Sequence, residues 1–204
     1  MITLHHLRIG RPLFTLWLME ELGVDYELKL YDRNDMGRAP PELKAVHPLG
    51  KSPVIEDDGH VIAESGAIAL HLVENYDTAG RFAPPSEKFA RARWFQWFLY
   101  SEASAFAPLL IKLLLSREQE PKPPVVSQFA AGEVELQLSY IAENLGDQDY
   151  ILGNTMTLPD FGITYICQMA QRLGHLDSYP TLQAYLERNT ALPAFQRALE
   201  IAGA

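Results

Sequence analysis

Hydrophobic and polar positions follow two different periods in the first third of the chain. Short alternating runs predict strands over residues 2–7, 26–31, 53–56 and 60–63. Stretches with a helical period lie between them and predict helices over 12–22, 41–46 and 65–76. Asp58-Gly59 is the dipeptide that a tight turn between two strands favours. The predicted order is therefore β-α-β-α-β-β-α, a small α/β unit.

The rest of the chain shows only the helical period, after the Gly/Pro-rich connector "DTAGRFAPPSEK". We expect Ser86 to cap a long helix that Pro108 kinks or ends. A proline-rich break at 121–124 then leads into a helix through Ala142, and shorter helices are predicted near 158–172, 180–189 and 192–201. The fold class is α/β plus all-α, with an N-terminal domain over 1–77, a linker over 78–87 and an all-α domain over 88–204.

Composition narrows the class of protein. The 204 residues are 48% hydrophobic, which is ordinary for a globular protein with a core, and the net charge of -9 disfavours nucleic acid as a partner. The N-terminus has no signal-peptide core and no later window reaches membrane-spanning length without charges, so we expect a cytoplasmic protein with no membrane partner. The single cysteine, Cys167, has apolar neighbours and is expected to be buried in a helix.

Two pairs of residues carry the first chemical signal. Pro53 either simply begins a strand or follows a cis bond, which would leave the backbone of Ser52 free to pair with an extended peptide ligand. Glu64 and Ser65 stand where a strand gives way to a helix, so Ser65 is a natural N-cap. Either the helix only caps itself, or its free N–H groups bind a carboxylate while Glu64 holds an ammonium group, as the α-amino-acid end of a ligand would require.

Thr157 and Asp160 have the spacing of a capping box, in which each side chain satisfies the backbone donor of the other residue. A buried aspartate beside a pocket could also act as a general base. We favour the structural role.

Pro53 and Glu64-Ser65, placed between a β-α-β-α segment and a helical half, resemble the glutathione-binding half of the glutathione transferase superfamily. "WLMEELGVDYEL", "HPLGKSPVIEDDG" and "TLPDFGITYI" also resemble that family's first helix and second strand, its cis-proline strand, and a helix of its C-terminal half. The resemblance implies a thioredoxin-like N-terminal domain that binds glutathione as a cosubstrate, and a helical domain that lines a pocket for a small apolar electrophile. It also implies a homodimer, a detoxifying role and no metal.

The resemblance assigns roles to individual residues. Lys51 would bind the glycine carboxylate of glutathione, Ser52 would present its backbone to the cysteinyl part beside cis-Pro53, and Glu64 with Ser65 would bind the γ-glutamyl end. Arg11, His47 and Arg38 are further candidates for carboxylate or loop contacts, or else solvated surface charges.

The family's usual thiolate-stabilising hydroxyl is missing. Aligned on Trp17, the serine of bacterial and fungal relatives with a Ser-Arg pair falls on Gly10, and Arg11 keeps the arginine. We expect Arg11 and the backbone around Gly10 to act at the sulfur. The alternatives are N–H groups at the helix start near Pro12, or the side chains of residues His5, His6 and Thr15.

Several functions therefore stay open beside glutathione transfer. The loop has no Cys-x-x-Cys pair, which argues against dithiol redox chemistry but leaves a glutathione-dependent peroxidase or reductase possible. A non-catalytic glutathione-binding or protein-interaction module is the other alternative, and Gly10 favours it. The six histidines are scattered and do not suggest a metal site.

Overall fold

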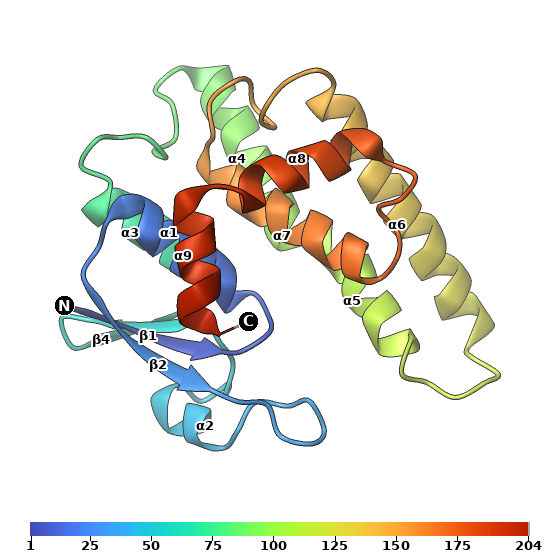
Figure 1. The fold of residues 1–204 in the computed structure, drawn as a ribbon, viewed down its shortest axis with the longest axis horizontal. Helices are drawn as coiled ribbons and strands as arrows, with labels where there is room; N and C mark the ends of the chain where they lie inside the picture. Colours follow the sequence, from blue (N-terminus) through green and yellow to red (C-terminus); the bar gives the residue numbers. More distant parts are fainter. Residues whose placement is uncertain (204) are drawn as a thin grey trace. The chain divides into compact units, whose positions relative to one another are not determined.

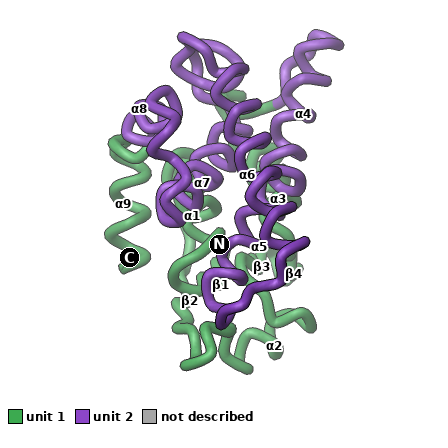
Figure 2. The backbone as a smooth tube through the Cα atoms, turned by 90° about the vertical axis from the view of Figure 1, so that its right-hand side faces the viewer, with its two compact units in different colours: residues 1–83, 190–204 green, residues 84–189 purple. Residues whose placement is uncertain are grey.

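The computed structural model describes residues 1–203 and divides into two compact units. Unit 1 comprises Met1–Ala83 together with Thr190–Ala204, and unit 2 comprises Pro84–Asn189 (Figure 2). Unit 1 therefore contains the α/β segment and the last helix of the chain, whereas unit 2 is helical.

Unit 1 is built on a four-stranded mixed sheet of order β2-β1-β3-β4. Its strand β1 pairs in parallel with β2 and antiparallel with β3, which pairs antiparallel with β4. Helices α1 and α3 cover one face and α2 lies against the other (Figure 1). This is the predicted thioredoxin-like arrangement. Its elements are β1 (Ile2–Leu7), α1 (Pro12–Leu22), β2 (Tyr26–Tyr31), α2 (Glu42–Val46), β3 (Val54–Asp57), β4 (His60–Ala63), α3 (Ser65–Tyr76) and α9 (Pro193–Ala202).

The helix α1 is apolar on nearly every side because β1, α3 and α9 all pack against it. The rings of Trp17 and Phe195 meet edge to face with centroids 5.2 Å apart, and Arg197 pairs with Glu20 at 2.9 Å. The last helix thus packs within unit 1, although the sequence predicted an all-α domain over 88–204 that includes it. The helix α9 buries its apolar stripe on α1, a contact between residues too far apart in sequence for local patterns to reveal.

Unit 2 contains five helices within the described residues: α4 (Lys88–Glu102), α5 (Phe106–Leu115), α6 (Pro124–Leu145), α7 (Leu158–Arg172) and α8 (Pro180–Thr190), of which the last residue belongs to unit 1. Their buried side chains form one cluster that includes Trp97, Leu138, Ile163 and Tyr185.

Two expectations about α4 and α5 were wrong. The carboxylate of Glu87, not the hydroxyl of Ser86, caps α4 by accepting from the N–H groups of Phe89 and Ala90. The helix then ends at Glu102, before Pro108, which lies in the first turn of α5. Proline is tolerated there because the first N–H groups of a helix have no partner within it.

The capping box of α7 is confirmed. The carboxylate of Asp160 accepts hydrogen bonds from the N–H and hydroxyl of Thr157, both at 2.8 Å, and also from the Ile151 N–H and the Tyr185 hydroxyl. Burial raises the pKa of this carboxyl, while the four donors act in the opposite direction. Asp160 therefore joins three segments of unit 2, which is the structural role that we favoured.

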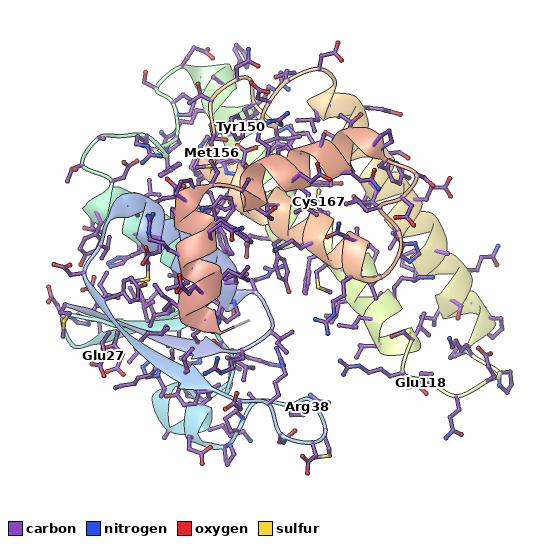
Figure 3. All side chains as sticks on the ribbon, viewed as in Figure 1. Glu27, Arg38, Glu118, Tyr150, Met156 and Cys167 are labelled. Atoms are coloured by element: carbon purple, nitrogen blue, oxygen red, sulfur yellow. The ribbon has the colours of Figure 1, made fainter. Side chains whose placement is uncertain are left out.

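Cys167 is fully buried in α7, as expected, and burial raises the pKa of its thiol to about 12 (Figure 3). The segment Lys88–Leu115 is apolar and long enough to cross a membrane by composition. In the structure it is two helices, α4 and α5, and core helices of soluble proteins meet the same criterion.

Candidate functional site

The loop between β1 and α1 is held in an unusual conformation. Ile9 has a φ of 58°, a value that β-branched residues rarely adopt. Its carbonyl accepts hydrogen bonds from Nη2 and Nε of Arg33, at 2.7 and 3.3 Å, and Arg33 Nε also lies 3.2 Å from the Arg8 carbonyl. The next residue is Gly10, the position where the family's hydroxyl was expected. Arg33 thus ties the loop to the segment that follows β2.

The Ser52–Pro53 bond is cis, as the resemblance implies. The ladder of β3 begins at Val54, so the backbone of Ser52 lies outside the paired residues of the sheet. The hydroxyl of Ser52 donates to the His5 carbonyl at 2.6 Å and accepts from the Leu7 N–H at 3.0 Å. These bonds fix Ser52 against the end of β1, and Lys51 beside it is exposed.

Glu64 and Ser65 form the start of α3, but with roles shifted by one residue. Glu64 is in the N-cap position and Ser65 is the first helical residue, so the prediction of Ser65 as the N-cap was wrong. Glu64 is exposed and has a φ of 72°. Such backbone strain is often found at functional sites. Ser65 is buried, and its hydroxyl accepts a hydrogen bond from Nη1 of Arg11 at 3.3 Å.

The structure therefore brings Arg11 and Ser65 together at the N-terminus of α3. A guanidinium, a hydroxyl and the positive end of a helix are three groups that favour an anion. Glu64 supplies a negative charge directly beside them. This arrangement matches the carboxylate and the ammonium group of an α-amino acid.

Several of the expected donors near Gly10 are engaged in bonds within the protein. The N–H groups of Leu13 and Phe14 donate to the carbonyls of Gly10 and Arg11, and Pro12 has no N–H. The ring of His5 makes hydrogen bonds with Tyr31 and Glu56. Because of these bonds, few hydrogen-bond donors at the start of α1 or on the His5 ring are available to a ligand.

His6 and Thr15 are each 1% exposed. Burial lowers the pKa of His6 to about 4, with a smaller contribution from the charge of Arg8. His6 is therefore a neutral buried ring at neutral pH.

The remaining candidates lie in loops and at a helix end. Arg38 is exposed on the loop that follows β2 (Figure 3). His47 follows α2, and its Nδ1 accepts from the N–H of Leu49 at 3.4 Å.

Arg33 was missed in the sequence because it stands between Asp32 and Asn34, where an arginine reads as a surface charge. The signal that could have found it is the parallel pairing of β1 with β2, in which Leu7 lies opposite Tyr31. Residues that follow the two strands then emerge side by side, so Arg33 reaches Ile9.

Within residues 1–203, no group of three or more His, Cys, Asp or Glu side chains is arranged to hold a metal ion.

Comparisons with known proteins agree with this geometry. Family models match residues 1–74, as the N-terminal domain of glutathione S-transferase, and residues 105–193, as its C-terminal domain. Glutathione S-transferase 3 of Schizosaccharomyces pombe is 37% identical over 185 residues, which cover 84% of this chain and 75% of the relative.

Solved structures agree in fold. A glutathione S-transferase from Actinobacillus pleuropneumoniae is 36% identical, covers 100% of this chain and 94% of its own, and has a TM-score of 0.91. A glutathione transferase homologue from Lodderomyces elongisporus, solved with two glutathione molecules per subunit, has a TM-score of 0.85 at 20% identity, with 98% of each chain covered. The chain belongs to the glutathione transferase superfamily.

Proposed function

We propose that this protein is a glutathione transferase, which binds glutathione in unit 1 and activates its thiolate for attack on a small apolar electrophile. The observation that carries the proposal is the pairing of Arg11 with buried Ser65 at the start of α3, beside the strained Glu64. Glutathione has an α-amino-acid group at its γ-glutamyl end, which these residues suit. The glutathione bound to the Lodderomyces homologue supports the same ligand class.

In this proposal the predicted binding residues have separate roles. Glu64 binds the ammonium group and Ser65 the α-carboxylate, with Arg11 adding positive charge. The backbone of Ser52, next to cis-Pro53, pairs with the cysteinyl part, and exposed Lys51 binds the glycine carboxylate. His47 and Arg38 are further candidates for contact with a carboxylate.

Activation means lowering the pKa of the bound thiol. A free thiol with a pKa of about 8.5 is only a few per cent ionised at pH 7. A decrease of about two units would make most of it reactive and corresponds to roughly 2.7 kcal/mol of differential interaction. The group that provides this at Gly10 was expected to be Arg11 with the local backbone, and the bond from Arg11 to Ser65 favours a role for Arg11 at the carboxylate instead.

One observation favours a second candidate, a glutathione-binding or protein-interaction module without catalysis. Gly10 supplies no side chain where the family has a hydroxyl or thiol. Such a module would bind glutathione and leave its thiol pKa unchanged.

We further propose a cytoplasmic homodimer that acts in detoxification and needs no metal. Large exposed apolar side chains on α4 and α6 support self-association, since monomers rarely expose contiguous apolar patches. They are Phe89, Leu99, Val125, Phe129 and Leu136.

The first experiment measures glutathione affinity by calorimetry and conjugation to an aryl halide by absorbance. The Ser65→Ala variant should bind glutathione about 10- to 100-fold more weakly, because a hydrogen bond to a charged group contributes roughly 1.5 to 3 kcal/mol. The matched control is Ser86→Ala, which removes an exposed hydroxyl that does not cap α4.

Wild-type turnover with a weaker Ser65→Ala variant supports the transferase. Glutathione binding without turnover of any aryl halide would favour the binding module. Absence of binding at millimolar glutathione would exclude the transferase and the glutathione-binding module, and would leave the protein-interaction module.

A further inference from the structure

The loop between β1 and α1 is attached to the far end of the chain by one side chain. Arg8 is the first residue after β1, and its Nη1 donates a hydrogen bond to the carbonyl of Ala202, the last residue of α9. The two residues are 194 positions apart in the chain and both lie in unit 1, where the end of α9 is beside the end of β1 (Figure 1). The C-terminal helix therefore contacts the loop that carries Gly10 and Arg11.

This contact has the chemistry of a helix cap. The last four carbonyls of a helix have no partner within it and form its negative end, so a cation is favourable there. Gly203 ends α9 with a φ of 64°, and a Cβ built on it would come too close to Nη1 of Arg8. The guanidinium of Arg8 therefore lies directly at the C-terminus of α9.

Arg8 is also bonded to the segment that follows β2. Its N–H donates to the carbonyl of Tyr31 at 2.9 Å, and its Nε lies 3.1 Å from a carboxylate oxygen of Asp32. The Asp32 side chain is 84% exposed, and an exposed ion pair contributes little by itself. Ala202 is fully buried. The bond to α9 is therefore the firmer of the two side-chain contacts.

The loop that begins at Arg8 carries a candidate binding residue. Ile9 follows with its φ of 58°, and a backbone in such a sparsely populated conformation persists only where its surroundings fix it. Arg11 is two residues further on, and it donates to the buried hydroxyl of Ser65. A displacement of Arg8 would therefore move Arg11 relative to Ser65.

We propose that Arg8 is a positioning residue for the glutathione site, which transmits the fixed position of α9 to the β1–α1 loop and so holds Arg11 at Ser65. The inference rests on the proposed function, because glutathione is the ligand whose affinity Arg8 would set. It makes the C-terminal helix, which supplies none of the proposed binding residues, a determinant of glutathione binding.

The test compares the wild type with Arg8→Gln, by calorimetry with glutathione at a temperature where both are folded. Arg8→Gln should raise the dissociation constant about 3- to 30-fold, as expected of a residue that acts through its neighbours. In conjugation assays the KM for glutathione should rise with kcat little changed, which is the pattern of lost ground-state binding.

The matched control is Arg197→Gln. Arg197 also holds α9 on α1, through its pair with Glu20 near the opposite end of α1 from the loop. Its removal should lower thermal stability and leave glutathione affinity unchanged. Amide hydrogen exchange gives a second readout without ligand: residues 9–11 should exchange faster in Arg8→Gln and at the wild-type rate in Arg197→Gln.

Two further variants separate charge from geometry. Arg8→Lys keeps the charge but loses the planar fork that reaches two partners, so its affinity should lie between those of the wild type and Arg8→Gln. Asp32→Asn keeps the bond to α9 and should weaken binding less than Arg8→Gln. An Arg8→Lys variant that binds as tightly as the wild type would assign the effect to charge and overturn the positioning role.

The outcomes also distinguish this inference from the proposed function. A wild type that does not bind glutathione would refute the proposed function, and the role of Arg8 with it. Equal affinities of the wild type and Arg8→Gln would leave the proposed function standing and overturn the role of Arg8. Equal losses of affinity in Arg8→Gln and Arg197→Gln would overturn it too, because the general packing of α9 would then account for the effect.

Discussion

Two adjacent histidines in β1 have opposite environments because successive side chains of a strand point to opposite faces. The ring of His5 lies 2.8 Å from the Tyr31 hydroxyl and 2.6 Å from a Glu56 carboxylate oxygen. His6 points to the opposite face of the sheet and has a buried Nδ1 with no hydrogen-bond partner. Burial followed by the charge of Arg8 lowers its pKa to about 4. One strand thus carries a hydrogen-bonded histidine and a desolvated one.

The lowered pKa of His6 makes stability depend on pH. In the unfolded chain a histidine takes up a proton near pH 6.5, whereas folded His6 does so only near pH 4. Its contribution is therefore present above pH 6.5 and is lost as the pH falls towards 4. From this shift, about 3 kcal/mol of unfolding free energy should disappear over that window.

Urea unfolding of the wild type and of His6→Leu, measured from pH 7 to pH 4, checks this. The variant should show a flatter pH dependence by about that amount, and the matched control His60→Gln, at an exposed histidine, should follow the wild type. Identical slopes for His6→Leu and the wild type would show that His6 is not the group responsible.

At the scale of elements, α4 and α7 approach each other closely at Gly162 and Ser101. A Cβ placed on Gly162 would come within 2.7 Å of the Cβ of Ser101, and closer still to its hydroxyl, which donates to the Phe98 carbonyl. The absence of a side chain at Gly162 therefore lets the backbone of α7 pack directly against the Ser101 side chain of α4. Helix propensity alone would not favour a glycine in the interior of α7.

Gly162→Ala should destabilise the protein even though alanine is the better helix former. We expect a loss of about 1 to 3 kcal/mol, typical of overpacking, measured by thermal and urea unfolding. Ser101→Gly combined with Gly162→Ala exchanges the small residue between the helices and should recover part of that loss. If Gly162→Ala instead stabilised the protein, α4 and α7 would have to move apart at little cost, and the close packing would not be required.

The elements also show what the sequence could predict. The bounds of β1, α1, β2, β4 and α3 were predicted to the residue because their apolar periods are bounded by glycine, proline or turn dipeptides. The predicted cap of α4 was wrong because serine is a preferred N-cap and glutamate is not, whereas in the structure the helix begins one residue later and the Glu87 carboxylate accepts from its first N–H groups. Arg33 and the contact between Gly162 and Ser101 join residues distant in sequence, so they needed the folded chain.

At the scale of the whole molecule, unit 2 exposes an apolar stripe along α6. Val125, Phe129 and Leu136 lie at spacings of four and seven residues, so they share one face, and they are 78, 58 and 59% exposed. The rings of Trp97 and Tyr140 stack between α4 and α6, which makes these two helices neighbours. We therefore place the proposed homodimer contact on the face of α4 and α6.

Phe129→Glu should convert the proposed dimer into a monomer of 23.0 kDa, because a charge in an apolar contact loses its hydration. Light scattering after size-exclusion chromatography measures the mass directly. Met36→Glu makes the same kind of change at an exposed residue in the loop after β2 and should leave the dimer intact. A wild-type protein that is already monomeric at micromolar concentration would disprove the homodimer.

Because α9 packs in unit 1, the two units can complete their folding in a particular order during synthesis. Phe195 and Arg197 reach Trp17 and Glu20 across almost the entire chain. A ribosome therefore releases the sheet and α1 long before the helix that covers them is made. The helical unit, continuous in sequence, can finish folding first, and unit 1 reaches its native packing only after α9 has been synthesised.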